Sequence, residues 1–422
     1  MNIWPMIIDL FHTNLPIILL RQQKVAFNKK LKCRSNICHV WRLPPAGGEP
    51  NGILNRYITA AIPCSLFRNH RLTPNKTETC YNRKQERADK MQTTFTDMEY
   101  ANRRKQTRRE IFLETMDKII PWNRLCGLIE PHYYHNKTGR PALGIEIMLR
   151  MYFLQIWFSL SDEMTEESIF DSHAMRNFMG INFLDRQAPD STTLMKFRHM
   201  LEKADLQKKI QAEILALLEE NGLIMHGGTI SDATIIQAPS STRNSTKERD
   251  TEMKSTRKGN NYHFGMKAHT GVDAGSGAVV NTAYTAANEH DVTQAVNCYR
   301  EDDDVRYGDA GFIGVEKRRE MELSDDFNRH KRTNEEVDYR ISKRPKSRSE
   351  KHDYPLNWEK KIEAQKSARR WIVEYPYYIV KRVFGCDKAV YRGIKKNGCR
   401  FDMAFACANL YMFRHRLLSF ST

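Results

Sequence analysis

The hydrophobic period of this chain changes near Gly222. Before it, apolar residues recur at helical spacing, as in "LQKKIQAEILALLEENG" at 206–222. After it, "LIMHGGTISD", "NYHFGMKAHTGVD" and "GAVVNTAYTAAN" show the two-residue period of strands and are separated by Gly-rich or polar turns. This order predicts an α-helical N-terminal domain followed by a mixed α/β sheet with flanking helices.

The helical domain is expected over residues 91–205. One amphipathic helix follows "RRKQTRRE", a second follows "KTGRPALG", and a third follows "PDSTT", capped by Asp190 or Ser191. A packing or dimerisation module and a reader of DNA ends both fit this pattern, because none of these helices carries a decisive recognition signature.

The α/β domain is expected over residues 206–422. After the three strands, "HDVTQAVNCYR" predicts a helix capped by Asp291, and "DVRYGDAG" predicts a fourth strand that ends on Asp309. A charged, turn-rich insertion at about 330–360 is expected to be an exposed loop without a large core of its own.

The positive charge of the chain is concentrated at its beginning. The net charge is +16, and residues 1–90 hold 15 Lys and Arg against 5 Asp and Glu. This stretch has no lasting period, so we expect it to be disordered. It is either a flexible basic arm that grips DNA or a region upstream of the natural start at Met91. The first twenty residues are interrupted by polar residues and prolines, so the sequence predicts no membrane span and an intracellular, cytoplasmic protein.

Three acids are candidates for a metal site. Asp232 is predicted at the end of the first strand, Asp309 at the end of the fourth, and Glu374 on a later helix. A lone acid after a strand is most often a turn or cap residue. Three oxygen ligands without a thiolate or paired histidines suit Mg²⁺ or Mn²⁺. Two such ions could activate an attacking oxygen and stabilise the leaving oxygen of a phosphodiester.

Four basic residues are candidates for DNA contacts. Arg370 lies one helical turn before Glu374, and Lys381 lies on the same predicted helical face. Lys388 and Arg392 are interspersed with aromatic residues, as in a DNA groove. Helix ion pairs with Glu374 and a solvated basic surface are the alternative interpretations.

A series of sequence blocks resembles a known family. The blocks are "GTISDATIIQAPSSTRN", "GNNYHFGMKAHTGVDAGSG", "TAANEHD", "YGDAGFIG" and "VEYPYYIVKRVFGCDKAVYRGIKKN". They look like the signatures of bacterial insertion-sequence transposases of the DDE type, of the insertion sequence 5 group, from Met91 to about residue 415. The resemblance implies a ribonuclease H-like core in which Asp232, Asp309 and Glu374 are the metal-binding acids. Arg370 and Lys381 match the family's Tyr, Arg, Glu, Lys signature, whereas Ser367 stands at its tyrosine position.

The same resemblance implies an activity and its partners. A DNA transposase would cleave strands at the element's terminal inverted repeats and join them to target DNA, with two Mg²⁺ or Mn²⁺ ions. Its partners would be double-stranded DNA and at least one further copy of the chain, since two ends are cut, and it would act at the bacterial nucleoid. The alternative is a catalytically inactive regulator or decayed transposase that binds element ends without cutting. The intact acids favour the enzyme.

Overall fold

A computed structural model describes residue 100 and residues 103–133, 142–183, 186–243, 247–318, 321, 337–343 and 357–421. They belong to one compact unit, Leu72–Thr422. The predictions for residues 1–90, and for most of the insertion at 330–360, fall outside the described residues.

Seven helices precede the sheet in the described part of the chain. They are α3 (Arg108–Ile119), α4 (Trp122–Ile129), α5 (Ile145–Phe158), α6 (Asp162–Asp171), α7 (His173–Met179), α8 (Ser191–Lys203) and α9 (Leu206–Glu220). Of the two predicted caps of α8, Asp190 is the cap, since its side chain accepts a hydrogen bond from the Thr193 amide at 2.9 Å, and Ser191 is the first residue of the helix. Helix α5 is apolar on nearly all sides and is buried among its neighbours, which makes it the centre of this helical layer.

The sheet has six described strands. These are β1 (Thr229–Gln237), β2 (Lys254–Lys258), β3 (Asn261–Asp273), β4 (Val279–Ala286), β5 (Val305–Gly308) and β6 (Asp338–Ile341). Their order is β2-β3-β1-β5-β6, and β4 also pairs with β3. Strand β1 is antiparallel to β3 and parallel to β5, while β5 is parallel to β6. The mixed sheet and the helical region before it confirm the predicted fold class.

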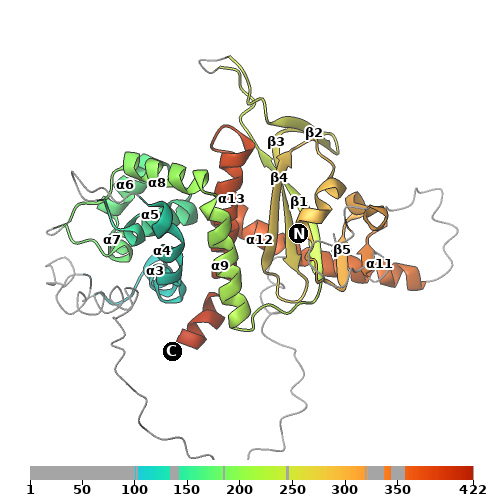
Figure 1. Ribbon diagram of the computed structural model, residues 1–422, viewed down its shortest axis with the longest axis horizontal. Helices are drawn as coiled ribbons and strands as arrows, with labels where there is room; N and C mark the ends of the chain where they lie inside the picture. Colours follow the sequence, from blue (N-terminus) through green and yellow to red (C-terminus); the bar gives the residue numbers. More distant parts are fainter. Residues whose placement is uncertain are drawn as a thin grey trace, which may run out of the picture. The chain divides into compact units, whose positions relative to one another are not determined.

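Further helices follow or interrupt the strands. They are α10 (Ala295–Cys298), α11 (Asn357–Arg370), α12 (Glu374–Tyr378) and α13 (Ile394–Ser421), with a 3-10 turn at Trp371–Val373 and a π-helical turn at Ile379–Val383. Helix α13 packs against α3, α5 and α9 and against strand β4 (Figure 1). It therefore joins the helical layer to the sheet, and one hydrophobic core continues through both.

The structure corrects several sequence predictions about the elements. Asp232 is the fourth residue of β1 and does not end the strand, because β1 begins only at Thr229 and continues to Gln237. The helix at 291 has His290 as its cap, and the Asp291 side chain instead pairs with Lys267. The strands β2 and β6 and the long helix α13 were not predicted.

No described helix is long and apolar enough to cross a membrane.

Candidate active site

The parallel pairing of β1 and β5 brings two of the candidate acids together. In this ladder Ser231 lies opposite Gly308. The next residue along each strand is an acid, Asp232 on β1 and Asp309 directly after β5. Neighbouring strands are about 4.8 Å apart, so this register alone places the two acids side by side in the middle of the sheet.

The third acid is carried by a short helical segment that is attached to β1. Glu374 begins α12, and the hydroxyl of Tyr377 in the same helix donates a hydrogen bond of 3.0 Å to the Asp232 carbonyl oxygen. A second hydrogen bond of 2.7 Å joins this hydroxyl to Thr270 on β3. One turn later, Lys381 Nζ donates to Thr234 Oγ1 at 2.6 Å and to the Ile235 carbonyl oxygen at 2.8 Å.

The electrostatics of Asp232 show that the three acids act on one another. Burial, together with the negative charges of Asp309 and Glu374, raises the pKa of Asp232 from 3.8 to about 7. The Ala233 amide and the positive charge of Arg370 act in the opposite direction. A carboxyl group in this environment resists ionisation until a positive charge arrives to neutralise it.

Arg370 lies beside Asp309. Its Nη2 atom is 4.0 Å from Asp309 Oδ2, while Asp309 Oδ1 accepts a hydrogen bond of 2.7 Å from the Gly311 amide. The Gly311 amide therefore orients the Asp309 carboxylate, and the guanidinium lies at the outer limit of an ion pair with it. The sequence had predicted Arg370 as a DNA contact or as an ion-pair partner of Glu374.

The donor set suits a hard divalent cation, because it consists only of carboxylate oxygens. Desolvation is the main cause of the raised pKa of Asp232, and the negative charges of Asp309 and Glu374 raise this pKa further. Within the described ranges, however, no group of three or more acids, histidines or cysteines is gathered closely enough to hold a metal ion. The carboxylates lie in one neighbourhood but are not arranged as a formed coordination shell.

A fourth acid, Asp291, lies in the same region, although the sequence predicted it as a helix cap. Asp291 Oδ1 is 3.0 Å from Lys267 Nζ and 3.8 Å from Nδ1 of the buried His269. A Cβ atom on Gly311 would lie 2.8 Å from Asp309 Oδ1 and 3.3 Å from Asp291 Oδ2. Asp291 therefore borders the Asp309 turn, a position that only the tertiary fold reveals.

The predicted basic and aromatic groove after residue 381 is only partly present. Lys388 and Arg392 are exposed, as DNA contacts would have to be. The aromatic rings are engaged elsewhere, since Phe384 is buried and Tyr391 lies 4.7 Å beneath the Arg198 guanidinium. The Lys381 ammonium group donates hydrogen bonds to Thr234 and Ile235 of β1, and burial lowers the pKa of Lys381.

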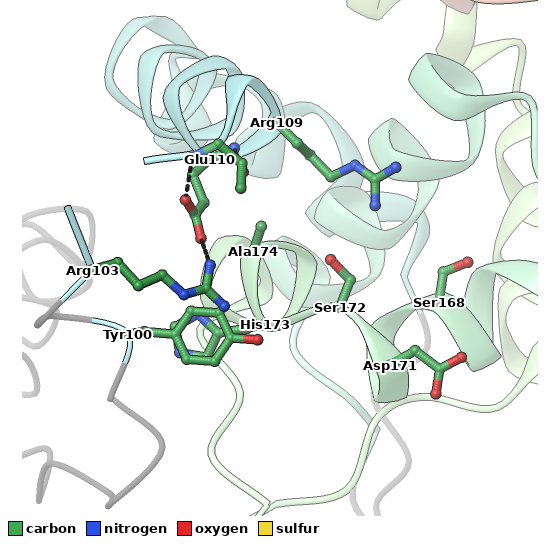
Figure 2. A pocket seen from close by; sticks show the side chains of 10 residues that line it. Tyr100, Arg103, Arg109, Glu110, Ser168, Asp171, Ser172, His173 and Ala174 are labelled. Carbon is green, nitrogen blue, oxygen red and sulfur yellow. Dashed lines mark hydrogen bonds and ion pairs between the residues drawn. The ribbon is translucent and has the colours of Figure 1, made fainter. Parts of the chain in front are cut away.

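A cavity of about 460 Å³ lies apart from these acids, in the helical layer. Figure 2 shows Arg103 stacked over Tyr100, which in turn stacks on His173, and Glu110 paired with Arg103. Its lining residues include none of the predicted site residues. Arginines and acids both line it, so it offers no preference for one charge.

The arrangement of strands and acids defines a class of protein. The mixed sheet has one acid on its central strand, one directly after the parallel neighbour, and one on a helix attached to the central strand. This is the ribonuclease H-like arrangement expected of enzymes that act on phosphodiesters with metal ions.

The comparisons with known families agree with that class. Residues 101–200 match a family described as a transposase domain (DUF772), and residues 225–410 match one described as a transposase DDE domain. The chain therefore belongs to the DDE transposases of insertion sequences. No solved structure matches the chain.

Proposed function

We propose that this transposase cleaves DNA strands at the ends of its own insertion sequence and joins the freed 3′ ends to target DNA. The observation that carries the proposal is the β1–β5 register, which places Asp232 beside Asp309, together with the influence of Glu374 on the same carboxyl group. The sequence blocks favour the insertion sequence 5 group within the family.

Each acid has a distinct place in the proposed site. Asp232 is the partly buried acid on a central strand, since β1 is paired with β3 on one side and with β5 on the other. Asp309 is oriented by the Gly311 amide, and Glu374 enters from a helix that Tyr377 attaches to β1. These three carboxylates would hold Mg²⁺ or Mn²⁺, and two bound ions would supply activation of the attacking oxygen and stabilisation of the leaving oxygen.

The proposed reaction consists of two phosphoryl transfers. In the first, a water oxygen attacks the phosphorus at the element's end, and the bond to the 3′ oxygen breaks to leave a 3′ hydroxyl. In the second, that hydroxyl attacks a phosphodiester of the target, a new bond to phosphorus forms, and a target 3′ hydroxyl leaves. Cutting two ends in one element would require at least two copies of the chain.

Strand cleavage is the direct test of this function. A labelled duplex taken from the DNA that flanks the coding region would be incubated with the full chain and Mg²⁺, and nicked strands would be separated on a denaturing gel. We expect nicking that EDTA abolishes. Asp232→Asn, Asp309→Asn and Glu374→Gln should each lose cleavage by more than about a hundredfold, because each removes a charge needed by the metal.

The same variants separate catalysis from binding. All three should retain the affinity of the native chain for the duplex, since affinity for DNA depends chiefly on basic residues that contact phosphates. Native cleavage by any one of them would remove that residue from the proposed site. Binding without cleavage by the unaltered chain would instead support a protein that only recognises ends.

A further inference from the structure

The β2–β3 hairpin extends beyond the rest of the sheet. Gly265 of β3 lies opposite Gln237, the last residue of β1, and also opposite Lys254, the first residue of β2. Residues 261–264 of β3 therefore continue past β1, and β2 is the described strand with which they pair. The Phe264 carbonyl oxygen also accepts a hydrogen bond of 2.8 Å from the Ala238 amide, directly after β1. The hairpin stands at the top of the sheet in Figure 1. It projects beyond the C-terminal end of β1, whereas the parallel neighbour β5 already ends at Gly308, opposite Ser231.

This hairpin carries positive charge without compensating acids. Lys254, Arg257 and Lys258 are all exposed, and none of the three forms an ion pair with a described residue. The nearest acids along the chain face another element. Asp250 accepts a hydrogen bond of 2.7 Å from the Gly393 amide, and Glu252 accepts one of 2.7 Å from the Ile394 amide. Those two acids therefore accept hydrogen bonds at the start of α13 and form no ion pair with the lysines and arginine of β2.

An exposed aromatic ring lies at the turn of the same hairpin. Tyr262 is 74% exposed, more than any other large hydrophobic side chain in the described part of the chain. Its neighbours in the turn are Gly259, Asn260 and Asn261, which offer it no hydrophobic cover. The Arg257 guanidinium lies 5.8 Å from the ring centre. An exposed aromatic ring among cations is the composition of a surface that stacks on nucleic-acid bases.

The hairpin continues the strand that pairs with the Asp232 segment. Asp232 lies opposite Thr270 of β3, and pairing with β2 begins at Gly265, five residues along the same strand. The charge of Lys258 acts on Lys381, whose ammonium group is bonded to Thr234 and Ile235 of β1. These two residues follow Asp232 by two and three positions on the same strand. A DNA strand that is held at the acids and follows β1 past Gln237 would therefore reach the positive ribbon.

We propose that the β2–β3 hairpin is a DNA-contacting ribbon in which Lys254 and Lys258 bind backbone phosphates of the DNA that extends from the acids past the end of β1, and Tyr262 stacks on a base. The inference rests on the proposed function for its choice of partner. It adds a surface that is separate from the three acids and from the predicted contacts at Arg370, Lys381, Lys388 and Arg392.

The test is equilibrium binding in EDTA, so that cleavage plays no part. Fluorescence anisotropy with the flanking-DNA duplex would be measured over a range of salt concentrations. For Lys254→Ala/Lys258→Ala we expect weaker binding and a salt slope lowered by about two charges' worth of counterion release. The matched control is Lys203→Ala/Lys209→Ala, which removes two exposed lysines from α8 and α9 and should leave the slope unchanged.

The tyrosine has its own pair of variants. Tyr262→Ala should weaken binding on the order of tenfold, whereas Tyr262→Phe, which keeps the ring, should bind like the native chain. Equal salt slopes for the hairpin variant and its control would overturn the phosphate contacts, and native affinity of Tyr262→Ala would overturn the stacking. Failure of the unaltered chain to cleave in Mg²⁺ would contradict the proposed function alone, because these binding results do not depend on metal.

Discussion

The Tyr377 hydroxyl donates a 3.0 Å hydrogen bond to the main-chain carbonyl oxygen of Asp232. Through it, the helix that carries Glu374 is attached to the strand residue whose side chain forms the centre of the site. Helix α12 is only five residues long and lies between a 3-10 turn and a π-helical turn. The backbone hydrogen bonds of so short a helix do little to fix the position of Glu374. The hydrogen bond from Tyr377 supplies this constraint.

Tyr377→Phe should lower the free energy of unfolding by about 1–2 kcal/mol, since it removes both hydrogen bonds of this hydroxyl, to the Asp232 carbonyl oxygen and to the Thr270 hydroxyl. It should also reduce cleavage while leaving DNA affinity unchanged. Urea unfolding and the gel assay measure the two effects. Tyr375→Phe, on the exposed side of the same helix, is the control and should change neither. Full cleavage by Tyr377→Phe would show that the hydroxyl does not position Glu374.

The raised pKa of Asp232 predicts how stability depends on pH in metal-free buffer. Its pKa is about 7 in the folded chain against 3.8 as the ordinary value. The folded state therefore binds the proton more tightly than the unfolded state between these two values. Across this interval, rising pH ionises the partly buried Asp232 carboxyl group and lowers the stability of the native chain.

Asp232→Asn removes the titrating group and should abolish that contribution. Relative to the native chain, the variant should gain stability as pH rises from about 4 to about 7 and keep a constant advantage above that interval. Chemical unfolding at a series of pH values, followed by circular dichroism, measures the difference. A difference that does not vary with pH would mean that Asp232 titrates near its ordinary value.

Lys381 tests whether a predicted DNA contact is instead a structural contact. Lys381→Ala leaves Thr234 Oγ1 and the Ile235 carbonyl oxygen without their donor, so it should destabilise the chain by about 1–3 kcal/mol. We expect the salt slope of DNA binding to stay unchanged, because the ammonium group is committed to β1. A slope reduced by about one charge would restore the phosphate contact that the sequence suggested.

Gly311 is constrained by the carboxylate that it binds. A Cβ atom there would lie 2.8 Å from Asp309 Oδ1, which is closer than real Cβ atoms approach such an oxygen. Gly311→Ala should displace the Asp309 carboxylate and reduce cleavage at least tenfold, with a small change in melting temperature. Gly127→Ala is the control and should leave cleavage unchanged, because a Cβ atom there meets no atom within 4 Å. Gly314→Ala is unsuitable as a control because Gly314 has φ +90°. Unimpaired cleavage by Gly311→Ala would show that Asp309 has room to adjust.

The sequence by itself determined the class of the fold and the identities of the three acids as candidates. The change of hydrophobic period near Gly222 separated helices from strands because burial on one face of an element imposes that period locally. Cap residues such as Asp190 were readable for the same reason, since a cap bonds amides within one turn. The family blocks gave Asp232, Asp309 and Glu374 their expected roles, and both family matches agree with the resemblance to a transposase.

Only the tertiary structure decided how these residues meet. The placement of Asp232 within β1, the side-by-side register with Asp309, and the attachment of α12 through Tyr377 all depend on pairing between segments about 75 to 145 residues apart. The hydrogen bonds from Lys381 to β1 and the ion pair between Asp291 and Lys267 also join segments that are distant in sequence. Local patterns report which face of an element is buried, but they do not report which distant element covers it. A side chain's partner is therefore fixed by the packing of the whole chain.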